Sequence, residues 1–396
     1  MSWPVVPLSQ ALKDAEVFVD GDWVESKDQD PNGDVRLIQL ADIGDGFFVD
    51  KSARFLTSEK AQKLRCTFLE EGDVLVARMP DPLGRACIFP GSSQPCVTVV
   101  DVCIIRPNTE HIDPQYLVHC LNNRITRQAI LKQATGTTRQ RISRGNLKTI
   151  KIPHPPIEEQ RRIAGILDRA EELRAKRRAA IALLDQLPQA IFIETFGSDT
   201  PTKPLSILAD LKRGPFGGAL KKEFFTEAGY KVYEQGNVIA SNFHSGSYYI
   251  DERRFQRMKG FAVRENDLLV TCSGTVGRIA QVPVDAAPGV INQALLRIRA
   301  DSKHVRPTFL HMALQSDHIQ RVLTGFTRGT GLKNFPPMPE VKALEIPTPS
   351  LAAQDTYLTN IDAICRAKAA HQSALTELDV LFTSLHWTCF SGHISK

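Results

Sequence analysis

Stretches of basic side chains are the feature of this 396-residue chain that most directly suggests a chemistry. From Arg124 to Lys151 the chain has several arginines and lysines and no Asp or Glu. The stretch from His318 to Pro339 also has no acidic residue and contains Arg321, Arg328 and Lys333. Cations without nearby counter-charges are expected where a surface contacts phosphates. The alternative for either stretch alone is an ordinary solvated surface.

Two glycine-containing segments that follow predicted helices are candidates for phosphate contact. Gly136–Arg141 and Gly329–Asn334 offer backbone amides, hydroxyl groups and cations, which are donors that bind phosphate oxygens. The candidate residues are Thr137, Thr138, Arg139, Gln140, Arg141 and, just beyond, Arg144, together with Thr330, Lys333 and Asn334. The glycine could also be a helix C-terminal cap, a role that is compatible with phosphate contact.

A second set of residues could read base edges. Arginine pairs bidentately with guanine, and asparagine or glutamine with adenine. The candidates are Arg78, Arg85, Arg278, Asn292 and Gln293, and a structural role is the alternative for each. Arg213 lies close to Gly217 and Gly218, which could let the backbone approach a duplex; the alternative there is a plain turn.

Catalytic signatures are not found in the sequence. There is no Gly-x-x-x-x-Gly-Lys-Ser/Thr loop, no Gly-x-Ser-x-Gly elbow and no His-Glu-x-x-His pair. An amino-methyltransferase would need Asn/Asp-Pro-Pro-Tyr/Phe, and the segment His154–Ile157 lacks both the polar first residue and the aromatic last one. We therefore expect a non-catalytic binding protein with no cofactor of its own. A nuclease or methyltransferase with a divergent site is the enzymatic alternative.

Composition places the chain among globular proteins, with 42% hydrophobic and 23% charged residues. No apolar run has the length of about 20 residues that a membrane span needs. The amino terminus lacks the layout of a signal peptide, so we expect a cytoplasmic protein without membrane contact. The 8 cysteines include no Cys-x-x-Cys pair, which argues against a zinc or redox site and favours reduced, mostly buried thiols.

The chain contains an internal repeat with an offset near 194 residues. Glu71–Val76 matches Glu265–Val270, and Gly84-Arg85 matches Gly277-Arg278. Further matches in the same order include Ile152-Pro153 with Ile346-Pro347, Gln160 with Gln354, and Arg174–Lys176 with Arg366–Lys368. So many ordered matches indicate a tandem duplication.

Each half is expected to open with an α+β globular segment rich in loops. Strands are predicted at Val35–Leu40, Asp73–Ala77 and Pro95–Ile105, and again at Val232–Glu234, Asp267–Thr271 and Val290–Arg299. Helices are predicted near Pro114–Gln133 and Pro307–Leu323. The predicted segments are 1–152 and 198–346, with 153–197 and 347–396 as the helices that close the two halves.

Apolar residues at three-and-four spacing predict that each closing helix presents a coiled-coil seam. Glu158 and Glu159 fall in the first turn of the first helix, where the helix dipole favours them. Pro188 is expected to kink or end that helix. The basic cluster Arg174–Arg178 is balanced by acidic residues on the same helix, so it is interpreted as an outer coiled-coil face rather than a phosphate site.

With these motifs in view, the whole chain resembles the specificity (S) subunit of type I restriction-modification systems. The resemblance rests on Ile152–Ile163, Arg213–Gly218, Thr271–Arg278 and Asn292-Gln293, and it adds Ser273 and Thr275 to the candidate DNA contacts. It implies two pseudo-repeated α/β target recognition domains separated by two long antiparallel coiled-coil helices. The second repeat departs from the pattern, because Pro347–Gln354 replaces the Pro-Pro-Ile-Glu-Glu-Gln helix entry.

The resemblance also implies partners. They are double-stranded DNA, two methylation subunits that use S-adenosylmethionine to methylate adenine, and optionally restriction subunits that use ATP and Mg. A helix of about 30 residues spans about 45 Å, slightly more than one turn of B-DNA at roughly 34–36 Å. Because the two halves differ in sequence, we expect an asymmetric, interrupted DNA target. A DNA-binding scaffold or regulator without a methylase is the alternative.

Overall fold

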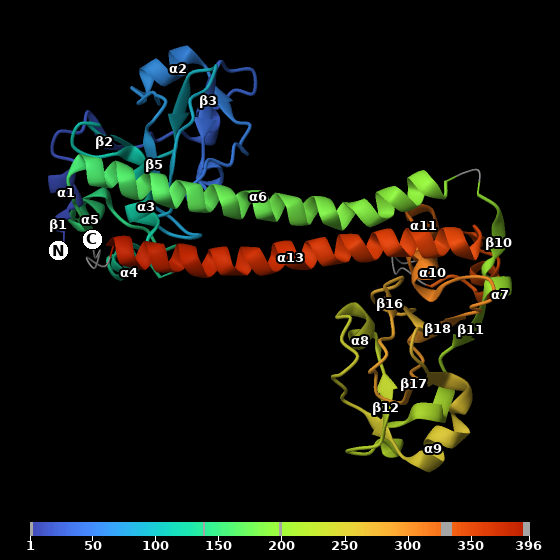
Figure 1. Cartoon of the computed structure of the whole chain (residues 1–396). Helices are drawn as coiled ribbons and strands as arrows, with labels where there is room; N and C mark the ends of the chain where they lie inside the picture. Colours follow the sequence, from blue (N-terminus) through green and yellow to red (C-terminus); the bar gives the residue numbers. More distant parts are fainter. Residues whose placement is uncertain (1–2, 138, 198–199, 326–334, 391–396) are drawn as a thin grey trace. The chain divides into compact units, whose positions relative to one another are not determined.

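The computed structural model describes residues 3–137, 139–197, 200–325 and 335–390. The chain forms two compact units (Figure 1). Unit 1 consists of Met1–Arg178 and Ser373–Lys396, and unit 2 of Ala179–Gln372. The finer division into four segments, at residues 152, 197 and 346, stays a prediction.

Unit 1 is built on two sheets. A four-stranded antiparallel sheet has the order β2-β8-β5-β6, with β2 (Val17–Asp20), β5 (Val74–Ala77), β6 (Ala86–Ile88) and β8 (Val102–Arg106). A three-stranded sheet has the order β4-β3-β7, with β3 (Val35–Ile38), β4 (Phe55–Leu56) and β7 (Cys96–Thr98). Strands β3 and β7 are parallel. A further antiparallel pair joins β1 (Val5–Pro7) to β9 (Lys151–Pro153).

Short helices complete unit 1. They are α1 (Leu8–Ala11), α2 (Ser58–Lys63), α3 (Pro114–Asn122), α4 (Arg124–Lys132), α5 (Arg144–Thr149) and the 3-10 helices η1 (Ser26–Asp28) and η2 (Leu40–Asp42). Asp113 caps α3 by accepting a hydrogen bond from the Tyr116 amide. A proline at the first position of α3 suits that start, because it has no amide hydrogen to satisfy.

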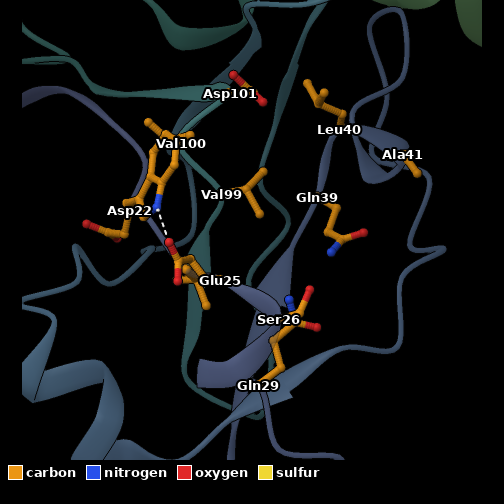
Figure 2. Close-up of a pocket in the computed structure, with 12 residues that line it drawn as sticks. Asp22, Glu25, Ser26, Gln29, Gln39, Leu40, Ala41, Val99, Val100 and Asp101 are labelled. Atoms are coloured by element: carbon orange, nitrogen blue, oxygen red, sulfur yellow. Dashed lines mark hydrogen bonds between the residues drawn. The ribbon is translucent and has the colours of Figure 1, made fainter.

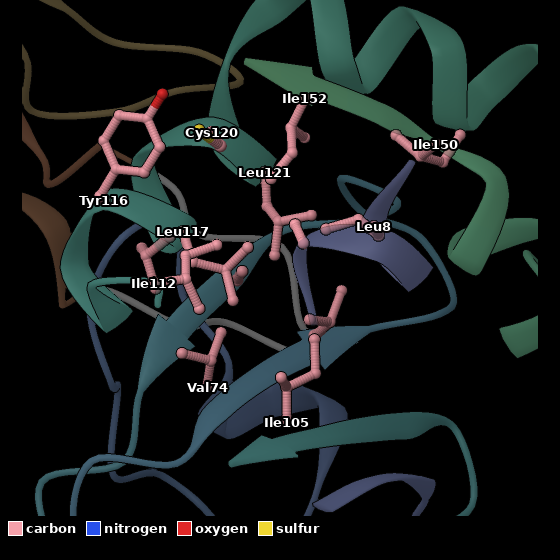
Figure 3. Packing of buried hydrophobic residues seen from close by; sticks show 14 of the residues in the cluster. Leu8, Val74, Ile105, Ile112, Tyr116, Leu117, Cys120, Leu121, Ile150 and Ile152 are labelled. Atoms are coloured by element: carbon pink, nitrogen blue, oxygen red, sulfur yellow. The ribbon is translucent and has the colours of Figure 1, made fainter. Parts of the chain in front are cut away.

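Strand β5 is buried on both faces, because its side chains alternate between two hydrophobic clusters. Val74 and Val76 pack with α3, whereas Leu75 and Ala77 pack toward the three-stranded sheet. Figure 3 shows Val74 and the neighbouring sheet residue Ile105 in the same cluster as Tyr116 of α3. A central strand covered on both sides explains why its sequence reads as a continuous apolar run.

Unit 2 repeats this design. Its antiparallel sheet has the order β11-β18-β15-β16, with β11 (Ala209–Arg213), β15 (Leu268–Thr271), β16 (Ile279–Gln281) and β18 (Leu295–Ala300). Its second sheet has the order β13-β12-β17-β14, with β12 (Tyr230–Tyr233), β13 (Tyr249–Ile250), β14 (Ala262–Val263) and β17 (Gly289–Ile291). Strands β12 and β17 are parallel, and β10 (Thr202–Pro204) pairs with β19 (Glu345–Pro347).

The helices of unit 2 are also short. They are α7 (Leu205–Leu208), α8 (Gln235–Ile239), α9 (Glu252–Arg257), α10 (Pro307–Leu314), α11 (Asp317–Thr324), α12 (Met338–Lys342), η3 (Gly217–Leu220), η4 (Lys222–Phe224) and η5 (Lys259–Phe261). The main sheets of the two units have the same strand order, and each second sheet contains a parallel pair, although that of unit 2 has the additional strand β14. This similarity supports the duplication inferred from sequence.

Four predicted elements are each split in the structure, among them the predicted helix Pro307–Leu323, which forms α10 and α11. The run Pro95–Ile105 was predicted as one strand, but it forms β7 and β8, which belong to different sheets. Val290–Arg299 divides in the same way into β17 and β18. The predicted helix Pro114–Gln133 breaks at Asn123, whose side chain accepts a hydrogen bond from the Ile125 amide and starts α4. Propensity alone did not reveal these breaks, because the residues on either side favour the same secondary structure.

The two long helices are α6 (Ile157–Thr195) and α13 (Leu351–Phe390), as predicted. In unit 1 the first part of α6 and the last part of α13 run antiparallel, with Arg174 bound to Asp379 and Ala164 sharing a core cluster with Phe390. Pro188 was expected to kink or end α6; it does not end the helix, which continues to Thr195, and the kink stays a prediction. None of the described helices is both long and apolar enough to cross a bilayer.

The altered entry of the second long helix still provides an N-terminal cap. The Ser350 hydroxyl accepts a hydrogen bond from the Ala353 amide at 3.3 Å. In the first long helix, Glu158 and Glu159 lie in the first turn as expected. A hydroxyl cap therefore takes the place of the acidic pair at the start of α13.

Candidate nucleic-acid interface

Three of the predicted contact segments meet at one end of the main sheet of unit 2. Strand β11 ends at Arg213 and β15 ends at Thr271, and their register partners in β18 are Leu296 and Leu295. The segments that follow β11 and β15, and the segment 292–293 that precedes β18, therefore leave the sheet at the same end. Antiparallel pairing brings together side chains that lie far apart in the sequence.

Gly214 fixes the backbone at this end of the sheet. A Cβ atom there would lie 1.8 Å from the Asn292 carbonyl oxygen. The Gly214 amide donates to the Leu295 carbonyl at 2.8 Å. The Asn292 side-chain oxygen accepts from the Ala294 amide at 3.0 Å, whereas Gln293 is exposed. Thus the structure uses the Asn292 oxygen within a turn and leaves Gln293 accessible.

Arg213 is positioned at the same sheet end with little internal pairing. Its Nη2 atom lies 3.5 Å from the Cys272 carbonyl oxygen, and its guanidinium lies 5.2 Å from the centre of the Phe335 ring. Its Nε atom is buried and has no hydrogen-bond partner among the described residues. Gly217 begins η3, three residues after Gly214.

The hairpin between β15 and β16 carries the other candidates of unit 2. Ser273, Thr275 and Arg278 are all exposed. The Arg278 amide donates to the Thr271 hydroxyl at 3.0 Å, which fixes the backbone at the end of the hairpin. Because exposed arginine and hydroxyl side chains offer hydrogen-bond donors, this end of unit 2 can address phosphates or base acceptors.

Unit 1 has a matching sheet end. A Cβ atom on Gly21 would lie 2.1 Å from the Thr98 hydroxyl oxygen and 2.3 Å from the Val99 carbonyl oxygen. The Gly21 amide donates to the Val102 carbonyl at 2.7 Å, as Gly214 does to Leu295 in unit 2. The sequence prediction missed this glycine, although its position 193 residues before Gly214 could have revealed it.

Arg78 and Arg85, predicted as base contacts, both bind the protein's own backbone. Arg78 is 5% exposed; its Nε atom donates to the Ile142 carbonyl at 3.0 Å, and its guanidinium pairs with Asp20. Arg85 is 7% exposed and donates to the carbonyls of Ile43, Leu40, Met79 and Pro82. Burial lowers the pKa of Arg85. These contacts fit the structural role that was the alternative to base contact for both residues. Base contact by either residue stays a prediction.

The predicted phosphate loop of unit 1 mixes free and paired side chains. Thr137, Arg139 and Gln140 are exposed, whereas Arg141 pairs with Asp101 at 3.1 Å. Arg144 makes a long contact of 3.5 Å with the Phe18 carbonyl. Thr138, and Thr330, Lys333 and Asn334 of the second predicted loop, lie outside the described residues.

A pocket lies beside the unit 1 sheet end (Figure 2). It has a volume of about 630 Å³, and Asp22, Glu25 and Asp101 are among its lining residues. Burial is the largest influence on Asp22 and raises its pKa. Asp101 is paired with Arg141 and Glu25 with Lys27, so these carboxylates already have cationic partners. The carboxylate oxygens can still accept further hydrogen bonds from amino groups, unlike the guanidiniums at the sheet end of unit 2. No group of His, Cys, Asp or Glu in the described part of the chain could hold a metal ion.

Comparisons with known proteins agree with this architecture. Residues 13–183 match the family model for the type I restriction modification DNA specificity domain. The proposed type I restriction enzyme MjaX specificity subunit of Methanocaldococcus jannaschii is 22% identical over 316 residues, which are 74% of this chain and 71% of that protein. The type I restriction enzyme EcoBI specificity subunit of Escherichia coli is 23% identical over 309 residues, 69% of this chain and 63% of that one.

A solved structure shares the fold over nearly the whole length. The matched chain comes from work on complex assembly and conformational transition of the type I R-M system. It covers 99% of this chain and 98% of its own, with a TM-score of 0.62 and 19% sequence identity. The family match and the named relatives agree: residues 13–183 carry the type I restriction modification DNA specificity domain, and most of the chain is similar to type I restriction enzyme specificity subunits.

Proposed function

We propose that this chain reads an asymmetric, interrupted DNA target, with one half-site assigned to each repeat. The observation that carries the proposal is the contrast between the two matched sheet ends. At the end in unit 1, Asp20 and Asp101 are paired with Arg78 and Arg141, whereas in unit 2 Arg213 and Arg278 have no carboxylate partner among the described residues. Because carboxylates and guanidiniums pair with different base edges, the two repeats would prefer different half-sites.

The chain supplies specificity rather than catalysis in this proposal. Two methylation subunits would flip and methylate adenine with S-adenosylmethionine, and restriction subunits would optionally add cleavage that uses ATP and Mg. The seam between α6 and α13 would set the separation of the two half-sites. Within unit 1 the charged groups of this seam are paired, as in the contact between Arg174 and Asp379. That pairing favours a protein-facing or solvated role for Arg174–Arg178 over phosphate contact.

Mapping of methylated adenines in cells with and without the gene tests the proposal. The expected result is one interrupted motif with unequal halves that disappears when the gene is deleted. A single continuous palindrome would contradict it. The alternative function, a DNA-binding scaffold without a methylase, predicts no gene-dependent methylation and no methylation subunit that co-purifies with the chain.

A further inference from the structure

An exposed aromatic side chain stands at the same register of each repeat. Trp23 follows Gly21 by two residues, and Phe216 follows Gly214 by two residues. The side chains of Trp23 and Phe216 are 67% and 76% exposed. Of the four positions 20–23 and 213–216, only the glycine and the aromatic character are common to both repeats. These two features therefore need separate explanations.

The glycine is explained within the fold. At both positions a Cβ atom would collide with the neighbouring chain, at 2.1 Å in unit 1 and 1.8 Å in unit 2. Each glycine also donates its amide to the main sheet, to Val102 in unit 1 and to Leu295 in unit 2. The close approach holds the following residues in a defined place, so Trp23 and Phe216 start from well-anchored backbone.

Packing does not explain the aromatic residues. The Trp23 indole donates one exposed hydrogen bond, to Glu25 at 3.1 Å. Phe216 is 76% exposed, and none of the ring contacts between described residues of unit 2 involves it. A single exposed aromatic is common on protein surfaces. Two at the same register, in repeats that otherwise differ there, indicate a contact outside the chain.

The surroundings of the aromatic pair favour nucleic acid as the contact. Phe216 lies in sequence between Arg213 and the exposed Lys222, and the hairpin that carries the exposed Arg278 leaves the sheet at the same end. Trp23 lines the pocket that contains Asp22, Glu25 and Asp101. Guanidiniums bind guanine edges and carboxylates accept from the cytosine amino group, while aromatic rings stack on bases or touch the thymine methyl group.

We propose that Trp23 and Phe216 make the apolar contacts with the bases of duplex DNA, one residue in each half-site. The polar side chains beside each ring then distinguish between bases. This inference rests on the proposed function and adds the residues that contact each half-site. It assigns part of the affinity for DNA to two aromatic residues that were not among the basic and amide candidates selected from the sequence.

The test uses the full chain in complex with its methylation subunits. Complexes carrying Trp23→Ala or Phe216→Ala are titrated by fluorescence anisotropy with the intact target and with duplexes in which one half-site or both are scrambled. Each variant should bind the intact target at least about tenfold more weakly. The loss caused by each variant should vanish when the half-site that its aromatic residue contacts is scrambled, and should persist when the other half-site is scrambled. The half-site that abolishes the loss should therefore differ between the two variants.

Matched substitutions separate this role from a general surface effect. Phe47→Ala in unit 1 and Val284→Ala in unit 2 remove side chains that are 62% and 78% exposed, and both should leave binding unchanged. Trp23→Phe and Phe216→Trp should retain most of the affinity. Thermal melting should match the parent complex, because both aromatic side chains are exposed.

Unchanged affinity in both alanine variants would overturn the proposal, as would a loss that persists whichever half-site is scrambled. Loss of methylation subunits from either variant complex on size exclusion would also overturn it and assign the rings to a protein contact. If the parent complex binds intact and scrambled duplexes equally, the proposed function itself is refuted. If the parent complex discriminates between them but the variants bind like the parent, only the assignment of Trp23 and Phe216 is refuted.

Discussion

The Arg174 Nε atom donates to Asp379 Oδ1 across 2.7 Å in unit 1, joining residues that are 205 positions apart. The counterpart in unit 2 is an ion pair between Lys368 and Asp185. Both partners are displaced by 194 positions, so the duplication extends to this contact. The structure thus matches Arg174 with Lys368, whereas sequence comparison had matched it with Arg366.

Removal of the Arg174 contact should weaken unit 1 modestly. The Arg174 side chain is 16% exposed, and its guanidinium also lies 4.3 Å from the centre of the Phe382 ring. We expect Arg174→Ala to lower the free energy of unfolding by about 1 kcal/mol. Arg174→Lys introduces the residue found at Lys368 in the second repeat and should retain much of this stabilisation. Urea unfolding of the single variants, Asp379→Asn and the double variant gives the coupling; purely additive losses would show that the pair does not interact.

The buried glutamines should be more costly to replace. Gln160 is fully buried, accepts from the Asp113 amide at 3.0 Å and donates to the His111 and Pro155 carbonyls. Gln354 makes the same pattern with Arg306, His304 and Pro349. Alanine at either position leaves buried backbone groups unpaired, so we expect losses of roughly 2–3 kcal/mol in unfolding free energy. Gln62→Ala, at an exposed glutamine, is the control. A similar loss of stability there would contradict the role given to the buried hydrogen bonds.

Sequence reasoning found the repeat, the long helices and the central strands because these depend on periodicity and spacing. It did not reveal that Arg78 and Arg85 bind backbone carbonyls, because the residues next to an arginine in the sequence do not show what surrounds its side chain in the fold. It also missed Trp23, since an exposed aromatic has no periodic pattern. Comparison of residues 20–23 with 213–216 could have found it. The split of Pro95–Ile105 depended on tertiary pairing with two sheets, which local propensity does not encode.

A half-buried histidine should make unit 1 sensitive to acid. Desolvation, with smaller contributions from His119 and Arg174, lowers the pKa of His386 to about 4 from an ordinary 6.5. The unfolded chain therefore binds more protons between these values. This contribution to stability is fully present above about pH 6.5 and is lost as the pH falls toward 4. His386→Phe, the residue found 194 positions earlier at Phe192, should reduce this loss.

Thermal melting of parent and His386→Phe complexes from pH 7.5 to pH 4.5 measures this effect. The melting temperatures should diverge as the pH falls, with the variant the more stable at the acidic end. Other titrating groups act on both proteins, so the difference isolates His386. A difference that does not change with pH would contradict the expected linkage.

The close-approach glycine of unit 2 should tolerate no side chain. Gly214→Ala would place a Cβ atom 1.8 Å from a backbone oxygen of Asn292. We expect a loss of about 1–3 kcal/mol or more in unfolding free energy and weaker DNA binding, because the sheet end must shift. Gly236→Ala is the matched control in the same unit, since nothing lies within 4 Å of its Cβ position. It should be neutral or slightly stabilising, because alanine is favoured over glycine in a helix.

The loop after α4 should contribute charge rather than sequence preference. Arg139 is exposed, whereas Arg141 is held by Asp101 at 3.1 Å. If Arg139 binds a phosphate, Arg139→Ala should weaken binding to all sequences and reduce the magnitude of the salt slope by about 1. The double variant with Arg141→Ala should weaken binding further and flatten the slope more. Titrations at several salt concentrations, with intact and scrambled targets, measure both effects. A change in the preferred sequence would contradict phosphate contact, because phosphates are common to every sequence and carry no base information.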